Sequence, residues 1–109
     1  MPMNLTIEVR GKPEKFHELY QTFQALIPTM RRETGCRDAH IYRDVEDGTA
    51  FFLSMDWEGP VKLEQYLRSS SGSALLGAVD LLSGAVRVRI GNDSPWEEVE
   101  VLKQMRKDA

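Results

Sequence analysis

Few side chains in this 109-residue sequence could carry out catalytic or metal chemistry, and their spacing excludes the common arrangements. His17 and His40 are its two histidines and Cys36 is its one cysteine, so the spacing assembles no metal-binding set of side chains. Cys36 and His40 share one face of a predicted strand, but four strand residues separate them by roughly 13 Å, which is too far for a nucleophile and its base. We therefore predict no metal site and interpret Cys36 as a half-buried structural residue.

A second group of residues could form a pocket for a small apolar molecule. Ala39 is small where its neighbours are large, which could leave a void against Met55. Arg37, Trp57 and Tyr66 combine polar tips with apolar bodies and could ring this void. In the alternative interpretation they are core residues, with Arg37 stacked on Trp57. The residues predicted to form this site are Arg37, Tyr66, Trp57, Ala39, Ile41, Leu53, Met55 and Leu67.

The elements that must position these residues follow from hydrophobic periodicity. Alternation of apolar and polar residues predicts strands at Leu5 to Val9 and at Val86 to Ile90. Between them, apolar residues at three- and four-residue spacing predict a long helix from Pro13, which Pro28 should kink or end. The run from Gly59 to Gly84 predicts two short helices or one broken helix.

A hairpin is predicted at the centre of the chain, around the turn Glu46-Asp47-Gly48. A three-residue loop with Gly48 in the left-handed conformation would pair Val45 with Thr49. Counting outward from that pair places Ile41 opposite Leu53, Ala39 opposite Met55, Asp38 opposite Asp56 and Arg37 opposite Trp57. Gly35 is expected to take the left-handed conformation where the preceding helix closes.

The element order is β-α-β-β-α-β, which predicts an α+β fold of the ferredoxin-like type, a four-stranded antiparallel sheet with helices on one face. The sequence Ser94-Pro95-Trp96-Glu97 fits a capping box, so we expect an additional C-terminal helix over about residues 95–107. The length suits a single domain over residues 1–109.

The face of the sheet that the helices leave uncovered collects both signs of charge together with aromatic residues. This pattern favours a self-complementary dimer interface across a two-fold axis, and the alternative is a solvated sheet face. Because Asp38 and Asp56 are a like-charge pair, a cation should lie nearby, either Arg10 or Arg87 or Arg89 of a second copy. The predicted interface residues are Glu8, Arg10, Asp38, His40, Tyr42, Asp56, Arg87 and Arg89.

Composition excludes several classes of partner and cofactor. The net charge of −3, from 14 basic and 17 acidic residues, provides no electrostatic footprint for nucleic acid or an anionic membrane. No glycine-rich phosphate loop is present, so we expect no nucleotide cofactor. The absence of a membrane-spanning run or targeting signal, together with a lone cysteine, predicts a cytoplasmic protein.

The stretch from Arg32 to Trp57 resembles the antibiotic biosynthesis monooxygenase (ABM) superfamily. The resemblance rests on a helix ending in Arg-x-Glu-x-Gly-Cys, a strand ending in Tyr-Arg-Asp, a short acidic turn, and a strand ending in Trp before an amphipathic helix. It covers roughly Leu5 to Ile90. Members of the superfamily include cofactor-free quinol oxygenases, haem-degrading enzymes and proteins with no assigned activity.

The resemblance implies a homodimeric α/β barrel and a cofactor-free monooxygenase that oxidises a small quinol or phenol. Arg37 would stabilise the phenolate, Tyr66 would relay a proton and Trp57 would form the pocket wall. Many relatives carry a histidine at the position of Tyr66, so histidine-ligated haem is not expected there. The alternative is a non-catalytic ligand-binding or interaction module that keeps the dimeric barrel.

Overall fold

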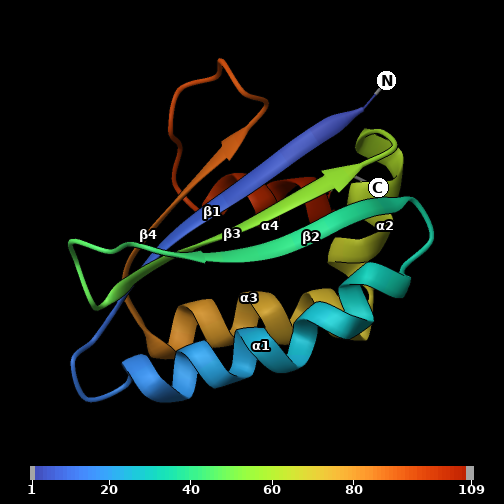
Figure 1. Cartoon of the computed structure of the whole chain (residues 1–109). Coiled ribbons are helices and arrows are strands. Elements are labelled where there is room, and N and C mark those ends of the chain that lie inside the picture. The colour runs from blue at the N-terminus through green and yellow to red at the C-terminus, as the bar shows by residue number, and fades with distance from the viewer. Residues whose placement is uncertain (1, 108–109) are drawn as a thin grey trace.

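The computed structural model describes residues 2–107 and contains the predicted four-stranded sheet. All three neighbouring strand pairs are antiparallel, and the strand order is β2-β3-β1-β4. This arrangement confirms the ferredoxin-like α+β prediction (Figure 1). The elements are β1 Met3–Gly11, α1 Phe16–Arg32, β2 Cys36–Arg43, β3 Ala50–Trp57, α2 Pro60–Arg68, α3 Ser70–Leu82, β4 Ser83–Ile90 and α4 Glu100–Lys107.

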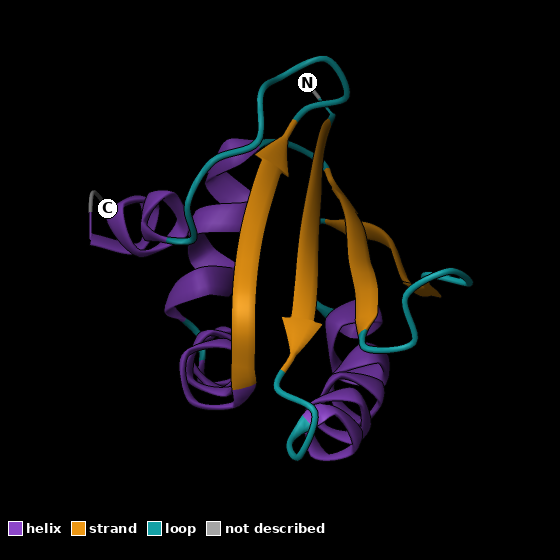
Figure 2. Ribbon diagram, turned by 90° about the vertical axis from the view of Figure 1, so that its left-hand side faces the viewer, coloured by secondary structure: helices purple, strands orange, loops and turns teal. Residues whose placement is uncertain are grey.

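The core lies between the sheet and the helices α1 and α3, which run side by side beneath the strands in Figure 1. Alternate residues of the central strands are fully buried on that face, as the period-2 pattern predicts. Leu102 of α4 also joins this core, and Figure 2 shows α4 at the left-hand side of the molecule. The buried sheet residues include Leu5, Ile7, Val9, Leu53, Met55 and Trp57.

The hairpin register is confirmed at its centre, but its turn differs from the prediction. Ile41 pairs with Leu53 and Ala39 with Met55. β2 ends at Arg43, however, so the predicted pair of Val45 with Thr49 is wrong, and Gly48 does not have a positive φ.

Side chains hold the backbone of this longer loop. Asp44 Oδ1 accepts from the backbone N–H of Glu46 at 2.8 Å and of Asp47 at 3.1 Å. Asp47 Oδ1 accepts from the N–H of Thr49 at 3.0 Å. Because aspartates stabilise turns through such bonds, the loop needs no left-handed glycine.

The beginning of β2 carries a bulge that corrects the predicted position of Arg37. Cys36 pairs with Trp57 and Asp38 pairs with Asp56, so Arg37 is the extra residue between them. The predicted pairing of Arg37 with Trp57 is therefore wrong. Gly35 does take the expected left-handed conformation, with φ of +91°, and its carbonyl accepts from the Glu58 N–H at 2.8 Å.

In the second half of the chain, the broken helix is confirmed and the C-terminal helix begins later than predicted. Ser69 separates α2 from α3, and its Oγ accepts from the Gly72 N–H at 3.1 Å. Glu97 does not cap a helix, because its N–H and C=O bond Val88 on the edge of the sheet at 2.7 and 2.8 Å. α4 therefore starts at Glu100 instead of near residue 95. The helix α1 continues through Pro28.

Candidate functional site

Trp57 and Tyr66 form the centre of the predicted site, and they join the end of β3 to α2. Their ring centroids are 5.1 Å apart with an interplanar angle of 33°. Trp57 is 0% exposed and Tyr66 is 2% exposed. The Tyr66 hydroxyl and Ser71 Oγ are 3.2 Å apart and share a hydrogen bond. The tertiary structure thus buries the polar tips of two predicted site residues on the helix side of the sheet.

The indole N–H of Trp57 has no hydrogen-bond acceptor among the described residues 2–107. A buried donor left without an acceptor costs about 1–3 kcal/mol relative to a satisfied one. Most buried polar atoms in proteins are satisfied, and the exceptions call for a specific explanation such as a ligand or strain. The Trp57 Nε1 atom is therefore the strongest pointer to a bound polar group at this site.

The burial of Tyr66 also lowers the acidity of its hydroxyl. Burial raises the pKa of Tyr66 to about 12, although the hydrogen bond with Ser71 acts in the opposite direction. At neutral pH the hydroxyl is therefore protonated and can donate a hydrogen bond or a proton. Burial likewise raises the pKa of the neighbouring Cys36 thiol, which disfavours the nucleophilic thiolate.

The remaining predicted pocket residues mostly fill space within the core. Ala39, Leu53, Met55 and Leu67 are each 0% exposed, whereas Ile41 is half-buried. Arg37 is exposed on the bulge, beside the Cys36 residue that pairs with Trp57. The structure therefore brings Trp57 and Tyr66 together. Arg37 lies at the exposed start of β2, next to the residue that pairs with Trp57.

A hollow of about 370 Å³ lies at the edge of the sheet between α1 and β2. Its lining includes Ile41, a predicted substrate residue, and His40, a predicted interface residue. His40 Nε2 lies 2.8 Å from Asp38 Oδ1. Tyr20 and Arg31 of α1 also line this hollow, and neither was predicted as a site residue. Their spacing of three and four residues from Gln24 and Pro28 places all four on one face of the helix, which is the pattern that could have identified them.

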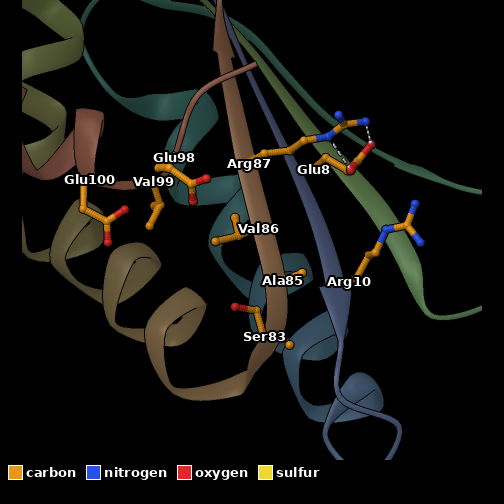
Figure 3. Close-up of a pocket in the computed structure, with 10 residues that line it drawn as sticks. Glu8, Arg10, Ser83, Ala85, Val86, Arg87, Glu98, Val99 and Glu100 are labelled. Atoms are coloured by element: carbon orange, nitrogen blue, oxygen red, sulfur yellow. Dashed lines mark hydrogen bonds and ion pairs between the residues drawn. The ribbon is translucent and has the colours of Figure 1, made fainter.

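Charged groups on the uncovered sheet face are largely paired within the chain. Arg87 bonds Glu8 through two nitrogen atoms, as Figure 3 shows, at 2.7 and 3.0 Å. Arg10 pairs with Asp47 at 3.1 Å instead of with the acids of β2 and β3. Asp56 accepts a hydrogen bond from Asn4 at 2.8 Å. Arg10 and Arg87, two of the three cations expected near Asp38 and Asp56, are thus engaged with other acids.

Trp96 covers part of this face at β4. The guanidinium carbons of Arg87 and Arg89 lie 4.4 and 4.3 Å from the centre of its ring. Nearby, a hollow of about 660 Å³ runs along the edge of β4 between Ser83 and the Glu98–Glu100 segment (Figure 3). On the same face, at the opposite edge strand β2, Tyr42 is 55% exposed.

The described residues also bear on metal binding and on membrane insertion. Within residues 2–107 no three or more His, Cys, Asp or Glu side chains gather closely enough to hold a metal ion. Among the helices described there, none has the length and apolar character needed to cross a membrane.

The strand order, the helical layer and the buried aromatic pair define an α+β protein of the ferredoxin-like class. The family model for "Antibiotic biosynthesis monooxygenase" matches residues 2–74, so the chain belongs to the ABM family. A comparison with curated protein sequences finds no match.

Solved structures of other proteins share this fold. Rv0793 from Mycobacterium tuberculosis has a TM-score of 0.79 and 20% identity, over 87% of this chain and 97% of its own. PA3566 from Pseudomonas aeruginosa has a TM-score of 0.76 and 20% identity, over 82% and 90% of the two chains. A structure described as an antibiotic biosynthesis monooxygenase has a TM-score of 0.75 and 16% identity, over 85% and 99%. At these identities the likeness shows the fold alone.

Proposed function

We propose that this chain is a cofactor-free monooxygenase that oxidises a small phenol or quinol with molecular oxygen beside Trp57 and Tyr66. The observation that carries the proposal is the buried indole N–H of Trp57, which has no acceptor among residues 2–107. A phenolic oxygen of the substrate would supply that acceptor. Membership of the ABM family and the name of one solved relative, an antibiotic biosynthesis monooxygenase, support the choice of reaction.

The reaction needs no external reductant, because the substrate supplies all the electrons. For a phenol, one atom of dioxygen replaces the hydrogen of a ring C–H as a carbonyl oxygen, and the phenolic O–H becomes the second carbonyl. The two displaced hydrogens leave with the other oxygen atom as water. The product is a quinone, and dioxygen is fully reduced. A hydroquinone reacts by the same balance to give a hydroxyquinone and water.

The residues near the pair have distinct proposed roles in this step. The Trp57 N–H would stabilise the phenolate oxygen in a dry site, where such a hydrogen bond acts strongly. Because burial raises the pKa of Tyr66 to about 12, its hydroxyl is suited to donate a proton to reduced oxygen and not to act as the base. Arg37, on the exposed bulge beside Cys36, would attract the phenolate toward the site.

A non-catalytic binding module of the same fold is the second candidate. The closed packing favours it, because Trp57 is 0% and Tyr66 2% exposed, so a substrate would have to displace packed side chains to enter. Ala39 is also fully buried, so it provides no open space at the surface. In this case a small ligand would be held by the same N–H without being oxidised.

We also propose that the protein is a homodimer that associates through the uncovered sheet face. Tyr42 is 55% exposed on that face, and its strand partner Phe52 is partly exposed. Aromatic residues that are exposed on a polar surface are characteristic of protein interfaces. Since Arg10 and Arg87 already pair within the chain and Arg89 stacks on Trp96, the proposed association rests on the aromatic side chains of this face.

Oxygen uptake with a panel of phenols and hydroquinones tests the enzymatic proposal. Tyr66→Phe removes the hydroxyl and Trp57→Phe removes the N–H, and both should lower turnover, the former by about 10²–10⁴-fold if it relays a proton. Tyr20→Phe is the matched control, because Tyr20 lines the separate hollow at β2. Ligand binding without oxygen uptake would establish the binding module. Loss of activity only in Tyr20→Phe would move the site to the β2 edge.

A further inference from the structure

A cationic groove lies between α3 and α4, on a part of the molecule that the proposed oxidation does not use. It encloses about 760 Å³, and its lining includes Arg68, Lys103, Arg106 and Lys107 with a single acid, Asp80. The chain as a whole carries a net charge of −3, with 17 acidic and 14 basic residues. The groove is therefore positively charged, although the chain as a whole is negatively charged.

Most of the positive charge in the groove is not neutralised by other residues of the described range 2–107. Lys103 Nζ pairs with Asp80 Oδ1 at 2.9 Å. Arg106 donates to the neutral Ser73 hydroxyl at 2.6 Å and so keeps its full charge. The side chains of Arg68 and Lys107 form no ion pair or hydrogen bond with another residue in the described range 2–107. A concave surface lined by one sign of charge concentrates its field and attracts counter-ions.

Helix termini explain part of this pattern but not the groove itself. Arg68 lies in the last turn of α2, and Arg106 and Lys107 lie in the last turn of α4, where cations are favourable next to the helix dipole. The helix dipole would be stabilised equally well by cations that point away from one another into solvent. Here two separate helix ends direct their cations to the lining of one hollow, beside a third helix that contributes a hydroxyl.

The floor of the groove is apolar and open. Leu76 is 4% exposed and forms part of the core. Next to it, a methyl group added at Gly77 would meet no other atom within 4 Å. The groove thus combines an apolar floor with guanidinium and ammonium groups around it. Guanidinium groups match the planar oxygen pairs of phosphate and carboxylate groups.

We propose that this groove binds a small organic oxyanion whose apolar body lies over Leu76 and Gly77, with a phosphate monoester as the class that best matches the charge. The phosphate dianion would contact Arg68 and Arg106, and Lys107 would add attraction from the end of α4. A carboxylate presents the same oxygen pair with half the charge. The site is separate from Trp57 and Tyr66, so it stands whether or not the oxidation proposal is correct.

Calorimetric titration of the whole chain at low ionic strength tests the proposal, with phenyl phosphate, benzoate, inorganic phosphate and phenol as probes. We expect phenyl phosphate to bind most tightly and phenol, which has the ring without the charge, to bind least. If benzoate binds more tightly than phenyl phosphate, the assignment to phosphate monoesters is wrong. No binding of any anion would overturn the site.

Three variants locate the binding. Arg68→Gln removes an exposed cation with no partner in the described chain and should weaken phenyl phosphate binding by about tenfold. Arg32→Gln makes the same charge change at the exposed end of α1 and should leave binding unchanged. Gly77→Leu should abolish binding by filling the groove, while the fold remains intact because the site has open space. Binding that survives Gly77→Leu, or that falls equally in Arg32→Gln, would refute the proposed location.

Discussion

Arg87 holds Glu8 in a two-point ion pair across β4 and β1, with Nε 2.7 Å from Oε1 and Nη2 3.0 Å from Oε2. Glu8 is only 8% exposed, although it lies on the face of the sheet that the helices leave uncovered. Planar two-point contacts of this kind fix the relative orientation of both side chains. The pair therefore stabilises the junction of two neighbouring strands.

Glu8→Gln should consequently lower the melting temperature by a few degrees, because it removes the charge that faces Arg87 inside a partly desolvated pair. Arg10→Gln is the matched control, since its ion pair with Asp47 is more exposed and should contribute little. Thermal unfolding followed by circular dichroism measures both variants. Equal melting temperatures for Glu8→Gln and wild type would show that the pair does not stabilise the sheet.

The raised pKa of Tyr66 predicts a loss of stability in alkali. The folded-state pKa is about 12 and the ordinary value is 10.0, so the folded chain holds this proton more tightly than the unfolded chain. The contribution is complete below pH 10 and is lost as the pH rises to about 12, with a total on the order of 3 kcal/mol. Urea unfolding across this range should show a steeper decline for wild type than for Tyr66→Phe. Parallel declines would contradict the assignment to Tyr66.

Two glycines on α3 should respond in opposite directions to the same substitution. A methyl group at Gly72 would lie 2.1 Å from the Tyr66 carbonyl oxygen and 2.8 Å from Leu67 Cα. Gly72→Ala should therefore cost roughly 3 kcal/mol or more, because backbone atoms must move. Gly77→Ala meets nothing within 4 Å and should stabilise the helix by about 0.5–1 kcal/mol. Chemical denaturation measures both, and a mild effect at Gly72 would indicate that the α2–α3 junction can relax.

The proposed dimer gives a prediction for Tyr42. Light scattering of the wild-type chain should give about twice the monomer mass of 12.4 kDa. Tyr42→Asp should shift the mass toward the monomer, because it replaces an exposed aromatic side chain of the proposed interface with a charge. Val61→Asp is the control, since Val61 is similarly exposed, at 60%, but lies on α2. A wild-type monomer at micromolar concentration, or dissociation by Val61→Asp alone, would rule out this interface.

The sequence determined the strands, their buried faces and the central hairpin register. Leu5, Ile7 and Val9 alternate with polar residues, and only one face of a strand can bury such a set. The same constraint fixed Ile41 opposite Leu53, because a shift by one residue would expose every apolar side chain of the hairpin. The break at Ser69 was also readable, since serine residues favour helix caps over helix interiors.

The tertiary structure alone decided the features that depend on contacts between distant segments. Because of the bulge, Arg37 does not pair with Trp57. Because Glu97 bonds Val88, α4 begins after this segment and not at residue 95. Neither choice follows from local propensity, because backbone groups can bond any strand edge that folding brings near. Likewise, the orphan N–H of Trp57 and the cationic groove at Arg68 arise only when separate elements pack together. Periodicity reports which side of an element is buried, whereas packing decides which polar groups meet there.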